Sequence, residues 1–420
     1  MAGWNGTGTF VRAYNWVTDK LASIKIIASR MDGEFDNYKA GLENCLTRDG
    51  QTPPTAGIDW NSQKTTSLAA GTAATDAANL GQVTGVTTGN AFRRNLLING
   101  AFDVWQAGAG GSASIAGGAT RTRTADCWWA VRASSATGYT VSQQAGAFGR
   151  YALKWQRDSG NSSTANMLLA QSLETANCVR LKRGTGTAMY LSFYAKKGAN
   201  YSGGNLTADV VLGTGTDENV LDGYTGASTL ATVAVSTLST SLQRFTLAVP
   251  ASTSINELGV RFTWTPTGTA GADDSITIEG VQLEAASAAT DFEFLPFDET
   301  LRQCQRYYEK PGFLYTTAPA QNVGNGGIFF PAIGSGAVVC GRFTVRCVQK
   351  RSSSGMVITT YNPAAANAEV YNDTDGANCV GVSTGLVPSY DGFYISFTGN
   401  AGMTAGDALV VNATLADPKF

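Results

Sequence analysis

The sequence predicts a mainly β protein with a short helical segment near its N-terminus, and three observations support this fold class. Charged residues make up 15% of the chain and glycine contributes 49 residues, a composition that suits short strands and tight turns better than long solvated helices. A helical hydrophobic period occurs in one stretch, before residue 46. From about residue 91 onwards, short runs rich in β-branched and aromatic residues recur between clusters of Gly, Ser, Asn and Asp.

The chain is long enough, at 420 residues, for two or three domains that each bury a core. Composition and motifs divide it into four parts. These are an N-terminal helical and extended region at 1–83, a linker at 84–94, a β-sandwich at 95–297 and a small C-terminal β domain at 298–420.

The helical stretch carries apolar residues at alternating steps of four and three, the a/d pattern of a heptad repeat. Asn15 or Thr18 is expected to cap its start, whereas Gly33 and Gly41 each weaken a continuous helix by about 1 kcal/mol relative to alanine. The stripe fits either helices packed within one chain or a contact between chains, and we favour the contact between chains. Its residues are Val17, Leu21, Ile24, Ala28, Met31, Phe35, Tyr38, Leu42 and Cys45. Residues 46–90 are polar and turn-rich, and we expect an extended segment there that needs a partner surface to become ordered.

The sandwich prediction rests on runs whose residues alternate with period two, so that one face is buried and the other wet. Runs of this length and spacing indicate two packed sheets. The clearest of them cover 188–195, 243–249, 258–264 and 275–283.

The absence of histidine excludes Ser-His-Asp and Cys-His nucleophilic systems, His-ligated zinc sites and histidine general bases. Carboxylate chemistry such as glycoside hydrolysis survives this exclusion. The net charge of −2 gives no reason to expect binding to nucleic acid or to an anionic membrane.

The seven cysteines are dispersed and form no CxxC pair, which predicts buried free thiols in a protein made in a reducing cytoplasm. We expect no signal peptide and no membrane insertion, because no apolar run reaches the roughly 20 residues of a membrane span.

Several motifs resemble parts of bacteriophage tail proteins. LTRDGQTPPTA at 46–56 and AAGTAATDA at 69–77 resemble the N-terminal region of phage tail fibre and tail-associated proteins. Four further segments are similar, in the same order, to carbohydrate-binding-module-like jelly rolls in phage fibres: NLLINGAFDVWQ at 95–106, ADCWW at 125–129, LSFYAKKG at 191–198 and IEGVQLEAASAATDFEF at 278–294. The resemblance implies a central jelly-roll β-sandwich whose body contains the first strand and the GVQLE strand.

The resemblance continues into the C-terminal part. CQRYYEK at 304–310 is similar to the segment that follows the jelly roll in many phage fibre proteins, and 342–351 and 356–361 match the strand pattern of the small β domain that comes next. The chain ends in Asp417, Pro418, Lys419 and Phe420, where the family often has an acidic Ala-Glu-Leu type terminus, so we expect a different terminal contact.

Candidate binding residues lie in the loops of the C-terminal domain, where tyrosines neighbour Asn, Asp and Pro, a context that suits recognition as well as ordinary loop packing. They are Tyr361, Asn362, Tyr371, Asp373, Asp375 and Tyr390. Trp128 and Trp129 are expected to point to opposite faces of one strand, and Trp105, Trp155 and Trp264 to lie in the core.

The densest carboxylates are Asp273–Asp274, Asp217–Glu218 and the trio Asp373, Asp375 and Asp391. We expect them to be solvated turn formers, with a calcium site as the alternative. We assign no catalytic residue, no metal and no cofactor.

The resemblance implies a phage tail fibre or other tail adhesin, most simply a homotrimer. In this interpretation 1–83 attaches to other phage tail proteins, and the distal β domains bind a host surface glycan or protein. Such a protein is made in the host cytoplasm, released by lysis and located in the virion tail. The alternative is a structural tail component, such as a nozzle, collar or decoration protein. A polysaccharide depolymerase is the third interpretation, disfavoured because the sequence has no repeat of β-helix period.

Overall fold

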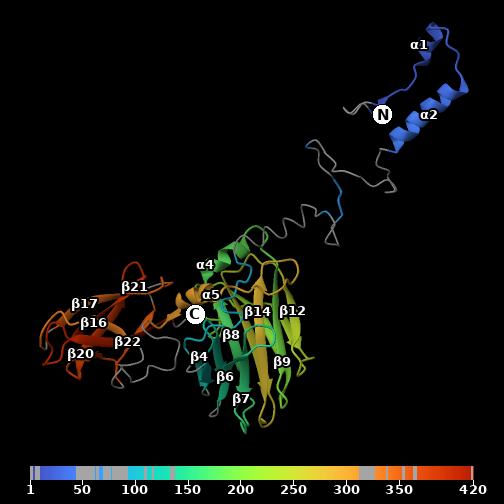
Figure 1. The fold of residues 1–420 in the computed structure, drawn as a ribbon. Helices are drawn as coiled ribbons and strands as arrows, with labels where there is room; N and C mark the ends of the chain where they lie inside the picture. The colour runs from blue at the N-terminus through green and yellow to red at the C-terminus, as the bar shows by residue number, and fades with distance from the viewer. Residues whose placement is uncertain are drawn as a thin grey trace. The chain divides into compact units, whose positions relative to one another are not determined.

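The computed structural model describes residues 3–4, 10–43, 62, 66–69, 77, 93–107, 111–115, 118–132, 138–311, 327–336, 339–351, 355–362, 367–417 and 420. The chain forms two compact units, Met1–Leu80 and Gly81–Phe420 (Figure 1). The extended segment predicted at 46–90 and its two motifs lie almost entirely outside the described residues.

The first unit contains a two-stranded antiparallel pair and two helices. Its elements are β1 (Gly3–Trp4), β2 (Phe10–Val11), α1 (Trp16–Leu21) and α2 (Ala28–Leu42).

Of the two residues expected to cap the helix, Asn15 and Thr18, it is Asn15 that caps α1. Its side-chain oxygen accepts hydrogen bonds from the backbone N–H groups of Val17 and Thr18 at 3.1 and 3.3 Å. The chain leaves the helix between residues 22 and 27, where Ser23 has a φ of 60°. The predicted heptad stripe is therefore divided: Val17 and Leu21 lie in α1, Ile24 lies in the connection, and the members from 28 to 42 lie in α2.

The second unit begins with a sandwich of two antiparallel sheets, each with six strands in the described part of the chain (Figure 1). One sheet has the order β11-β10-β13-β8-β5-β4, and the other has the order β12-β9-β14-β7-β6-β3. The first sheet contains β4 (Gly118–Arg123), β5 (Trp129–Arg132), β8 (Met167–Leu173), β10 (Gly203–Gly213), β11 (Ser228–Val235) and β13 (Glu257–Pro266). The second contains β3 (Ser112–Ile115), β6 (Tyr139–Ala145), β7 (Tyr151–Arg157), β9 (Met189–Lys197), β12 (Gln243–Val249) and β14 (Ser275–Glu284).

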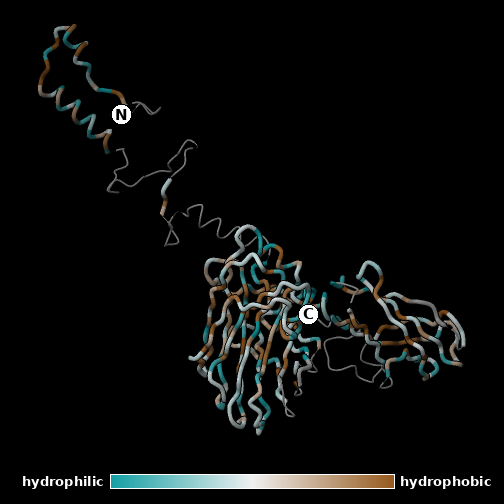
Figure 2. The backbone as a smooth tube through the Cα atoms, turned by 180° about the vertical axis from the view of Figure 1, so that it is seen from behind, coloured by the Kyte–Doolittle hydropathy of each residue, from teal (hydrophilic) through white to brown (hydrophobic). Residues whose placement is uncertain are grey.

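The mainly β prediction is confirmed, and the four runs singled out in the sequence correspond to β9, β12, β13 and β14. Alternate residues of each strand fill the space between the sheets, as Phe262 and Trp264 of β13 do without any exposed surface. Figure 2 shows hydrophobic stretches recurring along the strands of the sandwich. Trp128 lies in this core, whereas Trp129 lies on the other face, under the Arg121 and Arg123 guanidinium groups at 5.1 and 4.4 Å from its ring centre.

The GVQLE segment lies in β14, in the middle of its sheet, but 95–106 is not the strand that the resemblance implies. It is a buried loop, joined to β14 by an isolated bridge between Asn95 and Glu284. The Asn95 side chain explains the difference, because its Oδ1 accepts hydrogen bonds from the Leu97 and Leu283 backbone N–H groups, both at 3.1 Å. This Asx-type turn diverts the chain from a strand while Leu97 stays buried.

The C-terminal domain follows α5 (Phe297–Gln305) and has a core of its own. The central strand of its sheet, β22, pairs with β15, β16, β18 and β19, and buried residues such as Phe393, Leu409 and Val411 form the core. The described strands are β15 (Tyr308–Glu309), β16 (Ile328–Pro331), β17 (Val339–Arg346), β18 (Val357–Tyr361), β19 (Val370–Asn372), β20 (Ala377–Leu386), β21 (Gly392–Thr398) and β22 (Ala408–Ala416).

A third, smaller cluster joins the sandwich to this domain. It contains Val104, Cys127, Cys304, Tyr307 and Phe420. Phe420 thus lies buried against α5 and the sandwich. Free thiols are confirmed for five cysteines, of which Cys347 is half-buried and the other four are buried: Cys127, Cys178, Cys304 and Cys379.

Candidate functional site

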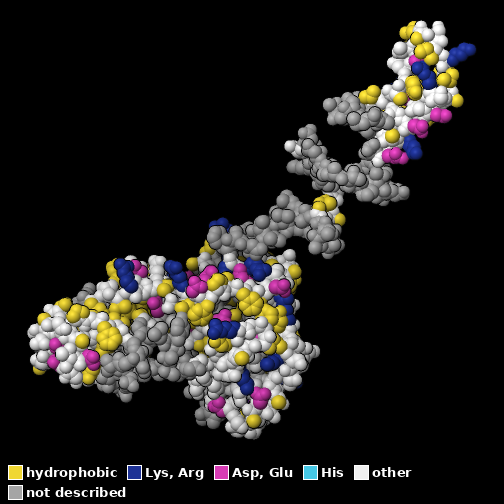
Figure 3. Space-filling model, in the orientation of Figure 1, with side chains coloured by type: hydrophobic (Ala, Val, Ile, Leu, Met, Phe, Trp, Pro, Cys, Tyr) yellow, Lys and Arg dark blue, Asp and Glu magenta, His cyan; other side chains and the backbone are white. Residues whose placement is uncertain are grey.

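The N-terminal unit exposes the apolar stripe that the heptad pattern predicts. Val17, Leu21 and Leu42 have exposed fractions of 71, 83 and 70%, and Phe35 has 59%. Ile24, Ala28 and Tyr38 are exposed as well, and Met31 is half-buried, whereas Cys45 lies outside the described residues. Figure 3 shows hydrophobic side chains on the surface of this unit beside charged ones.

A neighbouring face of α2 is polar and is covered by the segment before α1. Glu34 accepts a hydrogen bond from the Tyr14 backbone N–H at 2.9 Å and one from Arg12 Nε at 3.2 Å. The Asn37 side chain donates to the Val11 carbonyl at 2.9 Å. The polar side of the helix is therefore satisfied within the chain.

Gly33 and Gly41 make room for this segment. A Cβ at Gly41 would lie 2.0 Å from a ring carbon of Phe10, and one at Gly33 would lie 3.1 Å from a ring carbon of Tyr14. The two glycines that weaken α2 as an isolated helix let aromatic rings approach its backbone. Within the apolar stripe, Tyr38 stacks on the Phe10 ring at 5.6 Å between ring centres, whereas Leu21, Phe35 and Leu42 stay largely exposed in the described structure.

The six candidate receptor-binding residues lie in different parts of the C-terminal domain. Tyr361 ends β18, and its hydroxyl lies 3.5 Å from Thr414 Oγ1. Asn362 is buried, and its side-chain amide donates to Asn378 Oδ1 at 2.7 Å. Asn378 pairs in register with Tyr371 of β19, so the structure brings Asn362 and Tyr371 to the same place.

Asp373 and Asp375 are exposed in the turn between β19 and β20. Asp375 accepts hydrogen bonds from the Asn372 and Asn400 side chains at 3.0 and 2.9 Å. Tyr390 lies after the other end of β20 with a φ of 59°, and its carbonyl accepts the Lys350 backbone N–H at 2.8 Å. The candidates therefore form no single cluster, and their role in binding stays a prediction.

Several of the carboxylates singled out in the sequence form ion pairs. Asp274 is fully buried and pairs with Arg157 at 2.7 Å, while its neighbour Asp273 pairs with Lys154 at 2.9 Å. Asp217 pairs with Arg351 at 2.6 Å. The expectation of a solvated turn former is wrong for Asp274, because a buried guanidinium replaces water around it. In the described residues no three Cys, Asp or Glu side chains gather in a way that could hold a metal ion.

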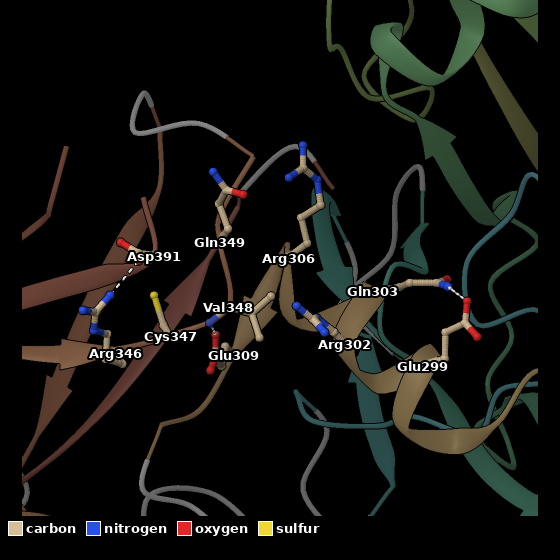
Figure 4. A pocket seen from close by; sticks show the side chains of 10 residues that line it. All are labelled: Glu299, Arg302, Gln303, Arg306, Glu309, Arg346, Cys347, Val348, Gln349 and Asp391. Atoms are coloured by element: carbon tan, nitrogen blue, oxygen red, sulfur yellow. Dashed lines mark hydrogen bonds and ion pairs between the residues drawn. The ribbon is translucent and has the colours of Figure 1, made fainter. Parts of the chain in front are cut away.

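A cleft along α5 is absent from the sequence predictions. It has a volume of about 930 Å³ and lies between α5 and the C-terminal domain. Figure 4 shows Arg302, Gln303 and Arg306 on the α5 side and Arg346 with Asp391 on the other.

Hydrogen bonds organise the far wall of this cleft. Arg346 pairs with Asp391 at 2.7 Å, and Glu309 accepts the Val348 backbone N–H at 2.9 Å. A hydrogen bond from Ser389, together with the Arg346 guanidinium, holds the pKa of Asp391 below its ordinary value. The four-residue spacing of Arg302 and Arg306 is the sequence signal for this cleft, because it places both on one side of a helix.

A second pocket, of about 600 Å³, shares Gln303 and Arg306 with this cleft. It extends towards the start of the sandwich and towards α4 (Thr175–Cys178) and the 3-10 helix η1 (Val179–Lys182). In the space-filling view, Lys and Arg side chains gather with acidic ones in the region of α4 and α5 (Figure 3).

No protein-family model and no curated protein matches the chain. Among solved structures, the enzymatically active domain of bacteriophage CBA120 tailspike protein 4 is similar over 45% of this chain and 21% of its own, with 12% identity and a TM-score of 0.26. The CBM22-1 xylan-binding domain of Paenibacillus barcinonensis Xyn10C is similar over 42% of this chain and all of its own, with 17% identity and a TM-score of 0.26. The family 11 carbohydrate-binding module of Clostridium thermocellum Lic26A-Cel5E is similar over 46% of this chain and 97% of its own, with 9% identity and a TM-score of 0.25.

This chain therefore spans about a fifth of the tailspike domain it matches. These scores and identities are low, and no functional residue is carried over from these structures. Within the described part of the chain, no helix has the length and apolar character needed to cross a membrane.

Proposed function

We propose that this chain is a non-enzymatic adhesin of a bacteriophage tail, that it assembles as a homotrimer through its N-terminal unit, and that its β domains bind a host surface glycan. The observation that carries the proposal is the exposed apolar stripe, which keeps heptad spacing along α2 and continues with the exposed Val17 and Leu21 of α1. A row of apolar side chains at heptad spacing is suited to contact between chains. The order of the motifs at 46–106 and 278–310 supports a place in the phage tail.

Assembly would give such a protein its binding strength. Three chains present three copies of each glycan site, and several fibres on one virion multiply that number. Weak single sites then act together, and avidity exceeds the affinity of one site by orders of magnitude.

The alternative is a structural tail component whose stripe is covered by other virion proteins. An exposed stripe fits contact with another virion protein as well as it fits self-association. The mass of the purified chain distinguishes these two possibilities. A polysaccharide depolymerase is the remaining candidate. Loss of viscosity of a host capsular polysaccharide on incubation with the purified protein would replace the adhesin proposal with that one.

The experiment that tests the assembly is light scattering on the purified full-length chain. One chain has a mass of 43.8 kDa, so a trimer would have three times that, about 131 kDa. We expect the trimer mass for the parent. A double variant, Leu21→Asp with Phe35→Asp, places charges in the stripe and is expected to give the monomer mass.

A matched control places the same charge on α2 outside the stripe. Ser29 is exposed and belongs to neither the stripe nor the polar face that contacts residues 10–14, so Ser29→Asp is expected to keep the trimer mass. A parent chain that stays a monomer at micromolar concentration would contradict self-association.

A further inference from the structure

The pocket beside α4 and η1 is lined by four arginines and one glutamate. It lies between the loop that starts the sandwich, the 174–183 segment and α5. The charged residues of its lining are Arg93, Arg180, Arg183, Arg306 and Glu174.

Glu174 is already neutralised. Its carboxylate accepts hydrogen bonds from Arg306 Nε at 2.9 Å and from Arg306 Nη2 at 3.3 Å, a two-point ion pair. The remaining three arginines therefore give the pocket a net positive charge.

Arg93 has only neutral acceptors among the described residues. Its Nη1 donates to the Gln303 side chain, and its Nε donates to the Asn95 carbonyl at 3.1 Å. Burial lowers the pKa of the Arg93 guanidinium below its ordinary value, although an arginine stays charged in proteins. The Glu293 carboxylate acts on this guanidinium electrostatically but forms no ion pair with it in the described part of the chain, so the half-buried cation can still attract an anion.

Arg180 and Arg183 lie on the outer side of the pocket. Both are exposed, and neither side chain forms an ion pair with a carboxylate in the described part of the chain. Their long side chains are therefore free to close on a ligand. The fork of donors on each guanidinium matches two oxygens of a carboxylate or phosphate group.

The rest of the lining suits a sugar ring. Leu96, Ile98 and Val179 contribute apolar surface, and the Asn177 side chain contributes an amide group. A volume of about 600 Å³ falls in the range of small-molecule pockets and has room for one or two sugar units.

We propose that this pocket binds an anionic sugar residue, that is, a saccharide unit that carries a carboxylate or a phosphate group. This proposal deepens the proposed function. That the ligand is part of a host glycan rests on the proposed function. All the residues that line the pocket belong to one chain, so the pocket does not depend on the assembly state.

Titration calorimetry on the purified full-length chain at low salt tests it with three probes. These are galacturonate, glucose 6-phosphate and neutral galactose. We expect at least one of the two anionic sugars to bind about tenfold or more tightly than galactose, since each Arg–anion contact is stronger than a neutral hydrogen bond. The stronger of the two identifies the anionic group. Equal binding of all three, or binding of none, would overturn the inference.

Variants connect the binding to the pocket. The double variant Arg180→Gln with Arg183→Gln alters only exposed side chains and is expected to weaken binding of the anionic sugar about tenfold or more. The matched control is Arg150→Gln, an exposed arginine outside both the pocket and the adjoining cleft. Circular dichroism verifies that both variants are folded. Unchanged affinity in a folded double variant would refute the assignment.

The outcomes for the pocket and for the proposed function can be told apart. A monomeric chain that binds galacturonate through Arg180 and Arg183 would keep the pocket and remove the trimeric adhesin. A trimer that binds none of the probes would keep the assembly and remove the pocket.

Discussion

At the scale of single residues, the Glu257 carboxyl makes the stability of the fold depend on pH. It has no exposed surface, one carboxylate oxygen accepts the Glu218 backbone N–H at 2.7 Å, and Oε2 has no hydrogen-bond partner in the described structure. Burial first, and then the Glu218 and Asp217 carboxylates, raise the pKa of Glu257 to about 7. In the unfolded chain the same carboxyl titrates near 4.5. Folding stability is therefore lost as the pH rises from about 4.5 to about 7.

Glu257→Gln removes this ionisation and keeps an oxygen that can accept the Glu218 N–H. We expect the variant to be more stable than the parent at pH 8, by about 1–3 kcal/mol in the free energy of unfolding, and to differ little from it at pH 4.5. Urea unfolding at the two pH values measures this. A gain of the same size at both pH values would show that the charge of Glu257 is not the cause.

The Arg157–Asp274 pair is the second residue-scale prediction. Both side chains are fully buried, and Arg157 also donates to the Ser163 and Gly268 carbonyls at 2.9 Å each. Arg157→Met leaves Asp274 buried and unpaired, which is expected to cost about 3–5 kcal/mol of the free energy of unfolding. Lys154→Met on the same strand breaks a partly exposed pair and is expected to cost less than about 1 kcal/mol. Similar losses in urea unfolding of the two variants would contradict a special role for the buried pair.

At the scale of elements, β14 contains an irregularity that the sequence pattern hides. Its register against β9 shifts between Glu279 and Gln282, and Gly280 has a φ of 54°. A Cβ at Gly280 would also lie 2.9 Å from a ring carbon of Phe148. The glycine of the GVQLE segment is thus required by the bulge, because a left-handed backbone costs about 1–2 kcal/mol in other residues.

Gly280→Ala is therefore expected to lower the free energy of unfolding by about 2 kcal/mol or more. Gly204→Ala is the matched control, since no atom lies within 4 Å of its Cβ position and its φ is not in the left-handed range. The control is expected to be neutral or slightly stabilising. Thermal unfolding of the two variants compares them, and a larger loss from Gly204→Ala would contradict the role of the bulge.

Strand positions could be predicted from the sequence because a period of two follows from the pleat itself, and β9, β12, β13 and β14 were found in this way. The β14 bulge could not, since it depends on Phe148 and Gly100, which are distant in the sequence. The same distinction holds for binding surfaces. The heptad stripe is a local pattern, whereas the arginine-lined pocket beside α4 and η1 combines Arg93, Arg180 and Arg306 from separate parts of the chain.

At the scale of the whole molecule, Arg351 connects the sandwich to the C-terminal domain. Its Nη1 lies 2.6 Å from Asp217 of the sandwich, and its Nε lies 2.8 Å from Asp417 of the C-terminal domain. The guanidinium also covers the Phe420 ring, 4.9 Å from the ring centre. A single cation thus holds carboxylates from two cores together next to the small joining cluster.

Arg351→Met is expected to uncouple the two cores, because it leaves two carboxylates near the joint without their shared partner. The free energy of interaction between the two cores is expected to fall by about 3 kcal/mol, the cost of breaking a largely buried ion pair. In differential scanning calorimetry the parent Gly81–Phe420 unit should unfold in one transition within the full chain, and the variant should show two. Arg346→Met removes an exposed pair in the same domain and should keep one transition. If Arg351→Met also keeps a single transition, the joining cluster of Tyr307 and Phe420, and not the ion pairs, holds the domains together.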